Sequence, residues 1–262
     1  MTSKRPDDAV ITSGSTIGIL GSGQLGRMMA VAAKQMGYRV DIFSPSGDSP
    51  AGQVSDREIQ GEYDDLHAIE EFAKSVDVVT VETENIPVST LQAAAKHVPA
   101  FPGDMTLKVC QNRRHEKEFV TQLGIPTCNF HIVRSVDELQ VACREIMPAI
   151  LKTTTGGYDG KGQATINSLA DVEQSWSALG ADEAILEERI DFDFEFSIVG
   201  FRNSSGEVSA YRSIVNEHQH GILDISFSPS SVADDVNERA TAAVFEIMNK
   251  LDSVGVLTVE FF

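Results

Sequence analysis

A short apolar run at 16–20 leads directly into a glycine-rich turn at 21–26 with the spacing G-x-G-x-x-G. An Ala- and Met-rich segment follows as far as Met36, and Gly37 is typical of a helix end. The order strand, tight glycine turn and helix is the beginning of a parallel strand–helix–strand unit. This order constrains the fold more than any other feature of the chain.

The alternation of strands and helices continues beyond this first unit. We predict strands at 38–43 and 77–82, helices at 65–75 and 87–97, and a Ser-, Pro- and Gly-rich loop at 44–55. Such alternation predicts an α/β fold with a parallel, doubly wound sheet.

Near residue 103 the pattern becomes less regular. The expected helices are at 104–123, 135–146, 168–179 and 231–251, and the expected strands at 129–133, 149–153, 163–167, 184–187, 194–201, 208–215 and 256–262. We therefore predict a flexible tail at 1–15, a Rossmann-like domain at 16–103 and a second, α+β domain at 104–262.

Composition excludes several classes of protein. The net charge of −18 argues against binding to nucleic acid, which needs a basic face. No apolar run approaches the roughly 20 residues that span a membrane. The acid-containing N-terminus is not a secretory signal, and three cysteines without metal-like spacing predict reduced thiols and a cytoplasmic protein.

The first glycine turn has the spacing of a dinucleotide fingerprint. That fingerprint also requires an acid at the end of the second strand, where this chain has Ser44, because Asp41 lies within the apolar run. The sequence therefore argues against a nicotinamide cofactor. A phosphate at the helix N-terminus and a turn that binds nothing both stay open.

A second glycine run, at 156–163, follows a predicted strand that ends near Lys152. Four glycines let consecutive backbone N–H groups approach an anion, and Lys152 and Lys161 bracket them with positive charge. The alternative is a hairpin turn with a solvated lysine. The two lysines, the Tyr-Asp pair at 158–159 and the preceding strand together favour a phosphate-binding loop.

Acidic residues supply the other candidate sites. Glu82 and Glu84 follow the third strand and are expected on one face of it, near the first glycine turn. Glu260 lies in an apolar strand, where a carboxylate is costly unless it is paired, so it is a candidate ligand for a hard cation. The two histidines at 218 and 220 with one Glu are too few for zinc, and a polar loop near a ligand is expected instead.

These motifs together resemble the ATP-grasp enzymes, and more narrowly the N5-carboxyaminoimidazole ribonucleotide synthase family of purine biosynthesis. The resemblance is carried by segments 21–27, 81–86, 152–163 and 216–223 and extends over about 16–262. It implies a pre-ATP-grasp domain followed by an ATP-grasp domain. It also implies a carbon–nitrogen ligase that carboxylates 5-aminoimidazole ribonucleotide with ATP and bicarbonate, through carboxyphosphate.

The resemblance also implies roles for individual residues. The expected catalytic residues are Tyr158, Asp159 and Lys161. The expected ATP-binding residues are Arg113, Lys152, Gly157, Tyr158, Asp159, Gly160, Lys161, Gly162, Gln163, Glu187, Glu188, Arg189, Ile190, Glu195 and His218. Gln24, Leu25 and Glu82 would bind the ribonucleotide, and Glu260 would bind Mg²⁺ or, as an alternative, Mn²⁺.

The chain departs from the family pattern at its end, where the family continues with an Asn-Glu pair and a small C-terminal domain. We therefore expect an inactive, C-terminally truncated fragment. Two alternatives stay open: another ATP-grasp ligase, such as a formate-dependent glycinamide ribonucleotide transformylase, and a non-catalytic nucleotide-binding Rossmann-like protein. A homodimer is the expected assembly by the same resemblance.

Overall fold

The computed structural model describes residues 11–157, 161–219 and 221–262. The chain divides into two compact units. The first contains the residues up to Lys108 together with 202–207 and 251–256, and the second contains 109–201, 208–250 and 257–262. The boundary falls five residues beyond the predicted 103, inside a helix, and two short segments from late in the chain belong to the first unit.

The first unit contains the predicted parallel sheet, in the order β3-β2-β1-β4-β5. All four strand pairs of this sheet are parallel. Its strands are β1 (Thr16–Leu20), β2 (Arg39–Ser44), β3 (Arg57–Gln60), β4 (Val78–Val81) and β5 (Ala100–Phe101). Its helices are α1 (Gln24–Gln35), α2 (Leu66–Lys74), α3 (Val88–Ala95) and most of α4 (Asp104–Cys110), with a 3₁₀ turn at Gly52–Val54.

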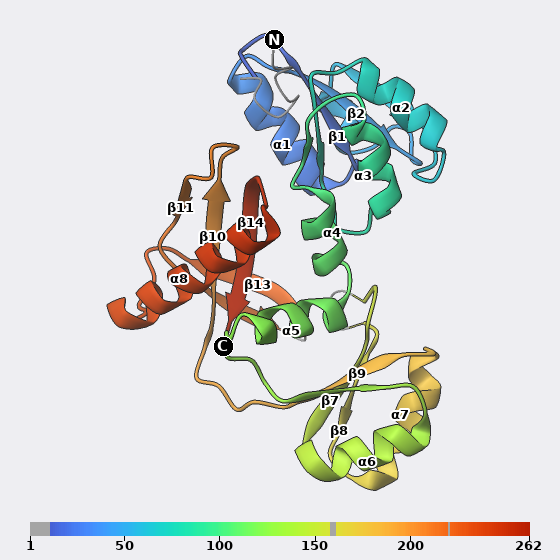
Figure 1. The fold of residues 1–262 in the computed structure, drawn as a ribbon, viewed down its shortest axis with the longest axis vertical. Helices are drawn as coiled ribbons and strands as arrows, with labels where there is room; N and C mark the ends of the chain where they lie inside the picture. Colours follow the sequence, from blue (N-terminus) through green and yellow to red (C-terminus); the bar gives the residue numbers. More distant parts are fainter. Residues whose placement is uncertain (1–10, 158–160, 220) are drawn as a thin grey trace. The chain divides into compact units, whose positions relative to one another are not determined.

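Side-chain alternation along β1 and β2 explains why helices cover both faces of this sheet (Figure 1). Ile19 and Ile42 pack into one core with Ala30 and Ala33 of α1. Their neighbours Leu20 and Phe43 point to the other face and pack into a second core with α2 and α3. Consecutive apolar residues are therefore buried on opposite faces, as a doubly wound sheet requires.

The sequence analysis did not predict two strands of this sheet, β3 and β5, or the 3₁₀ turn at Gly52–Val54. β3 and β5 are short, and β3 contains two charged residues, so neither gives an apolar signal. An ion pair joins β3 to β2. Arg57 donates to the buried carboxylate of Asp41 through Nε at 3.0 Å and Nη2 at 2.5 Å. The Asp41 carboxylate is thus paired with Arg57 inside the sheet.

The second unit contains two further sheets. One has the order β6-β9-β7-β8 and is antiparallel, with β6 (Phe130–Val133), β7 (Ala149–Thr153), β8 (Gln163–Ile166) and β9 (Ala184–Glu188). Helices α6 (Val136–Ile146) and α7 (Val172–Leu179), the latter preceded by a 3₁₀ turn at Leu169–Asp171, pack on it around one apolar core. The glycine run is therefore the connection of the β7–β8 hairpin.

The other sheet has the order β11-β10-β12-β13, with β14 also paired to β10. Its strands are β10 (Glu195–Arg202), β11 (Val208–Ala210), β12 (Ile214–Gln219), β13 (Ile222–Phe227) and β14 (Gly255–Phe261). Helix α8 (Asp234–Leu251) covers one face through Val244 and Met248, which pack with Phe196 and Ile198. The predicted strand at 208–215 is wrong, because the chain forms two strands there, and β13 was not predicted.

The predicted helix at 104–123 is also two helices, α4 and α5 (Arg113–Gln122). Asn112 separates them because its side-chain oxygen caps α5, accepting from the backbone N–H groups of Arg114 at 2.9 Å and His115 at 3.2 Å. The break also lets the Arg113 N–H donate to the carbonyl of Thr154 at 2.8 Å. The start of α5 is thereby attached to the strand that carries the second glycine run.

Candidate functional site

A buried carboxylate between two lysines lies at the centre of the second unit. Glu187 on β9 is 6% exposed, and its Oε2 accepts a hydrogen bond from Lys152 Nζ at 2.5 Å. Its Oε1 lies 3.7 Å from Lys117 Nζ on α5. Lys152 and Glu187 come from neighbouring antiparallel strands, and Lys117 comes from the helix that Asn112 begins. One negative charge thus holds two positive charges close together.

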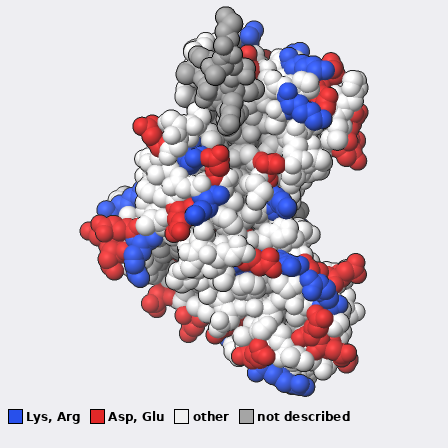
Figure 2. Space-filling view, viewed as in Figure 1, with Lys and Arg blue, Asp and Glu red and all other residues white. Residues whose placement is uncertain are grey.

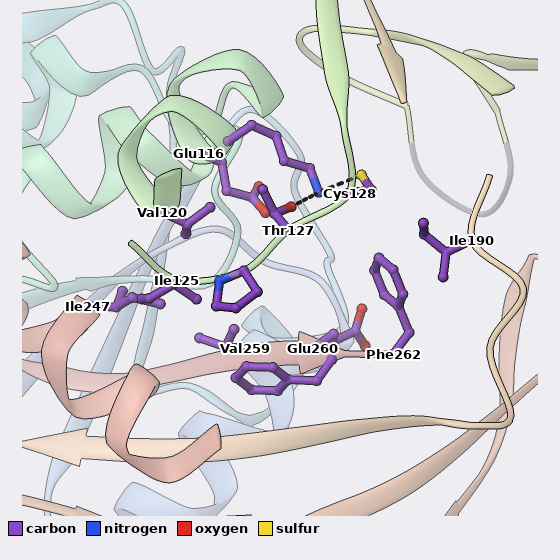
Figure 3. Close-up of a pocket in the computed structure, with 13 residues that line it drawn as sticks. Glu116, Val120, Ile125, Thr127, Cys128, Ile190, Ile247, Val259, Glu260 and Phe262 are labelled. Carbon is purple, nitrogen blue, oxygen red and sulfur yellow. Dashed lines mark hydrogen bonds between the residues drawn. The ribbon is translucent and has the colours of Figure 1, made fainter. Parts of the chain in front are cut away.

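A cavity of about 290 Å³ lies beside this cluster. Lys117 lines it and donates to Thr127 Oγ1 at 2.9 Å and to Cys128 Sγ at 3.5 Å, as the dashed lines in Figure 3 show. Apolar side chains, among them Ile190 and Phe262, form much of the wall, and Figure 3 shows both beside Glu260. A largely apolar cavity with a few polar groups is typical of a site for a flat aromatic ligand such as a purine base.

Glu116 also lines this cavity. Its side chain is exposed along the concave wall, and the surrounding protein raises the pKa of Glu116 by desolvation, partly offset by the positive charge of Lys117. A carboxyl group with a raised pKa exchanges its proton closer to neutral pH than an ordinary glutamate does. Sequence reasoning did not single out this group, because it stands among charged residues on a polar helix.

Arg113 binds the backbone at the start of the second glycine run. The guanidinium donates to the carbonyl oxygens of Thr153 at 3.0 Å, Gly156 at 2.6 Å and Gly157 at 2.8 Å. The sequence analysis expects Arg113 to contact phosphate. In the structure its guanidinium binds backbone carbonyl oxygens of the loop that would surround a phosphate. The arrangement leaves the positive charge of Arg113 beside the run.

Two glycines of the run pack against one side chain. Gly157 and Gly162 have φ of +75° and +68°, and a Cβ on either would lie 3.3 Å and 3.0 Å from Thr153 Oγ1. Within the described part of the chain, that hydroxyl is buried without a hydrogen-bond partner. Lys161 is exposed, and Gln163 is the first residue of β8, opposite Lys152. Tyr158, Asp159 and Gly160 lie outside the described residues.

The remaining predicted ATP residues lie at the end of β9 and on β10 and β12, which belong to two different sheets. His218 Nδ1 lies 2.8 Å from Glu195 Oε2, which joins two of them on β12 and β10. Glu188 accepts from the Asn129 side chain at 2.7 Å, and the Arg189 N–H donates to the carbonyl of Pro148. Ile190 reaches the cavity, whereas the Glu187 carboxylate binds the lysines.

The first glycine turn wraps around Glu82, which follows β4. A Cβ on Gly21 would lie 2.4 Å from Glu82 Oε2, and one on Gly23 would lie 2.6 Å from Oε1. A Cβ on the third glycine, Gly26, would lie 3.3 Å from the Cγ of the same side chain. All three fingerprint glycines are therefore needed to accommodate one carboxylate, which occupies the place that an anionic pyrophosphate has in a dinucleotide site.

Gln24 and Leu25 lie at the start of α1 and are exposed, so both are available to a ligand next to Glu82. Tyr63 is a further group that the sequence did not indicate. Burial, together with the negative charges of Glu82 and Glu62, raises the pKa of Tyr63 to about 12. Its hydroxyl is thus a hydrogen-bond donor at all physiological pH values.

The described residues do not complete a metal site. Among 11–157, 161–219 and 221–262 there is no group of three or more His, Cys, Asp or Glu side chains that could hold a metal ion. Glu260 is exposed at the cavity wall and supplies one carboxylate. In the same part of the chain, every helix is too short or too polar to cross a bilayer.

Charged side chains of both signs are interspersed over the face in view in Figure 2. This distribution agrees with a protein of net charge −18 in which positive charge is concentrated only locally, as in the pair Lys117 and Lys152. Such an arrangement suits a small phosphorylated ligand rather than a nucleic acid.

Two family models match the chain. Residues 14–111 match the ribonucleotide synthetase preATP-grasp domain, and residues 118–262 match the ATP-grasp domain. The N5-carboxyaminoimidazole ribonucleotide synthase of Bacillus subtilis is 40% identical over 254 residues, which cover 97% of this chain and 67% of that protein. A bifunctional purine synthesis protein purC/E of Dictyostelium discoideum is also 40% identical, over 98% of this chain and 26% of that protein.

Solved structures agree with these matches. An ADP complex of an N5-carboxyaminoimidazole ribonucleotide synthetase has a TM-score of 0.92 at 41% identity, covering 97% of this chain and 68% of that one. The synthase of Aspergillus clavatus, in complex with ADP and 5-aminoimidazole ribonucleotide, has a TM-score of 0.87 at 26% identity, covering 95% and 66%. The chain thus spans about two thirds of these synthases and a quarter of the bifunctional protein.

The prediction of a pre-ATP-grasp domain with a parallel sheet, followed by an α+β ATP-grasp domain, is confirmed. So is the resemblance drawn from four segments of the chain, and the matches likewise cover nearly the whole chain. This protein belongs to the N5-carboxyaminoimidazole ribonucleotide synthase family of ATP-grasp ligases.

Proposed function

We propose that this protein uses ATP to carboxylate 5-aminoimidazole ribonucleotide with bicarbonate, giving N5-carboxyaminoimidazole ribonucleotide, ADP and phosphate. The observation that carries the proposal is the position of Glu187, which holds Lys152 and Lys117 together beside a largely apolar cavity. Positive charge next to a cavity for a base is what a nucleoside triphosphate requires.

The cavity is the proposed site of the adenine ring, with Ile190 and Phe262 against its faces. Glu195 and His218 form the adjoining pair that would face the ribose. Lys152 would bind a phosphate oxygen directly, and Arg113 would support the glycine run around the phosphates through three carbonyl oxygens. Phosphoryl transfer depends mainly on such positioning and on charge neutralisation.

The proposed reaction has two steps. In the first, a bicarbonate oxygen attacks the γ-phosphorus of ATP, the bond to ADP breaks, and carboxyphosphate forms. In the second, the amine nitrogen of the ribonucleotide attacks the carboxyl carbon, phosphate leaves with the electrons of the carbon–oxygen bond, and the nitrogen loses a proton. Tyr158, Asp159 and Lys161 remain the predicted catalytic residues where bicarbonate and the amine of the ribonucleotide react.

The ribonucleotide would bind at the first glycine turn. Glu82 can accept hydrogen bonds from the two ribose hydroxyl groups, and the exposed side chains of Gln24 and Leu25 adjoin it. A carboxylate at this place accepts hydrogen bonds from hydroxyl groups and repels the pyrophosphate of a dinucleotide. This preference argues against the alternative of a dinucleotide-binding protein.

Mg²⁺ is the proposed companion of ATP, with Glu260 as one ligand. Because the described residues contain no group of three or more possible metal ligands, we assign no step to the metal. We also propose that the protein acts in the cytoplasm, where reduced thiols such as Cys128 and Cys143 persist, and that a homodimer is its assembly.

The test is calorimetric binding of ATP, NAD and 5-aminoimidazole ribonucleotide, followed by assay of phosphate release. We expect binding of ATP and of the ribonucleotide and no binding of NAD. That this chain is inactive stays a prediction, and any phosphate release from it should require both bicarbonate and the ribonucleotide. Glu82→Gln should lose affinity for the ribonucleotide and keep affinity for ATP. Product formation from formate and glycinamide ribonucleotide instead would contradict the proposal and favour the transformylase alternative.

A further inference from the structure

A carboxylate in the first unit organises the loop that packs on the first glycine turn. Glu58 on β3 accepts from the backbone N–H groups of Asp48 and Ser49, both at 3.0 Å, and from the Ser49 hydroxyl. Asp48 has a φ of +51°, which is uncommon for a residue other than glycine and needs such support. One side chain therefore fixes the start of the segment 48–53.

This segment in turn contacts the turn that surrounds Glu82. The N–H of Ala51, which is fully buried, donates to the carbonyl of Ser22 at 3.0 Å. Arg27 of α1 donates to the carbonyl of Pro50 at 2.9 Å and to the Gln53 side chain at 3.2 Å. The loop and the glycine turn are thus joined by backbone and side-chain hydrogen bonds.

The packing around Glu58 leaves no spare room. A Cβ on Gly52 would lie 2.1 Å from Glu58 Oε1 and 2.2 Å from Cδ, so a methyl group there would displace the carboxylate. A Cβ on Gly26 would lie 3.3 Å from the Cβ of Ala51, which shows how closely the segment approaches the turn. A shift of the segment would therefore move the turn with it.

We propose that Glu58 is a positioning residue for the ribonucleotide site: it holds the segment 48–53 as a fixed wall against the glycine turn that carries Gln24, Leu25 and Glu82. The inference rests on the proposed function for the identity of the ligand. Glu58 touches no substrate and acts through Ser49 and Ala51.

The experiment compares Glu58→Gln and Gly52→Ala with the unaltered protein. Glu58→Gln replaces one acceptor oxygen by an amide donor, which faces a backbone donor, while Gly52→Ala displaces the unaltered carboxylate. Both should weaken binding of 5-aminoimidazole ribonucleotide about tenfold or more, whereas ATP affinity should change less than about twofold. Glu71→Gln, which removes an exposed acid paired with Lys74, is the matched control and should change neither affinity.

A double variant separates a specific role from general damage. In Gly52→Ala with Glu58→Ala, the new methyl group enters space that the carboxylate has left, so Gly52→Ala should add little to the effect of Glu58→Ala alone. Fully additive losses would overturn the proposal, because they would mean that the two positions act separately.

Hydrogen exchange gives a readout that needs no ligand. We expect Glu58→Gln to speed exchange of the Ala51 amide and of the amides at 21–23, and to leave the amides of β9 unchanged. Unchanged exchange at Ala51, or unchanged ribonucleotide affinity, would overturn the role of Glu58. Failure of the unaltered protein to bind the ribonucleotide would instead contradict the proposed function, and hydrogen exchange would still decide whether Glu58 holds the segment.

Discussion

Lys152 Nζ donates to Glu187 Oε2 at 2.5 Å, across two neighbouring strands, and the second oxygen of the same carboxylate lies 3.7 Å from Lys117. The carboxylate is almost fully buried, and both lysines are largely buried. Two cations thus share the Glu187 carboxylate, and Glu116, which lines the cavity, is a second acid whose charge acts on both of them. An anionic ligand would bind here through the two lysines.

Removal of the shared carboxylate should be more harmful than removal of one lysine. Glu187→Gln leaves two partly buried ammonium groups without a counter-charge, and we expect a loss of about 3 kcal/mol in the free energy of unfolding. Lys152→Met should cost less, because Glu187 keeps Lys117, but it should weaken ATP binding. Chemical denaturation and calorimetry measure these effects.

The control for this pair is Lys74→Met, which breaks the exposed Lys74–Glu71 ion pair. It should change the free energy of unfolding by less than about 1 kcal/mol. If Lys74→Met and Glu187→Gln lowered the free energy of unfolding equally, burial of the Glu187 cluster would not contribute to stability as we expect.

Arg113→Lys should loosen the second glycine run. An ammonium group cannot donate to three carbonyl oxygens in the planar pattern that the guanidinium uses at Thr153, Gly156 and Gly157. We expect ATP affinity to fall about tenfold, which corresponds to roughly 1.4 kcal/mol, and amide exchange at 154–157 to become faster. Retention of both properties in Arg113→Lys would show that charge alone is sufficient there.

Two adjacent glycines offer a matched comparison. Gly156 and Gly157 both have positive φ, so alanine at either position should cost about 1 kcal/mol from the backbone alone. At Gly157 the new Cβ would also lie 2.7 Å from the carbonyl oxygen of Lys161, whereas at Gly156 no atom of the residues that the structure describes lies within 4 Å. Gly157→Ala should therefore lower stability and ATP affinity more than Gly156→Ala, as measured by denaturation and calorimetry; the reverse order would contradict this packing.

Stability should depend on pH through Glu116. Its pKa is raised in the folded protein, so the folded state binds a proton more tightly than the unfolded state. The favourable contribution is complete below the ordinary glutamate pKa of about 4.3 and is lost as pH rises through the folded value. Glu116→Gln should thus raise stability near neutral pH and have a smaller effect at low pH.

The comparison of pH 4 and pH 7 denaturation curves for Glu116→Gln checks this sign. Glu118→Gln on the same helix is the control for a change of helix charge, since Glu118 is outside the lining of the cavity and pairs with Arg114 at 2.7 Å. If both variants showed the same pH dependence, the effect would not come from desolvation of Glu116 at the cavity.

Much of the first unit was predictable, because local pattern and tertiary packing agree there. Apolar strands such as 16–20, the glycine turn and the helix stop at Gly37 each have a local signal, and all three are confirmed. β3 could not be predicted in this way: it is held by the ion pair between Arg57 and Asp41, whose partners lie on different strands. The helix break at Asn112 was also missed. Its cap is a local signal that the prediction overlooked, whereas its bridge to Thr155 depends on a distant hairpin.

The sequence by itself determined the family and the two glycine runs, because these rest on residue types at fixed short spacings. Tertiary structure decided which groups act together. Only the fold brings Lys117, Lys152 and Glu187 from three separate elements around one buried charge, and only the fold directs Arg113 to backbone carbonyl oxygens. Pairing across strands depends on register and burial, and these are properties of the packed chain that no short segment contains.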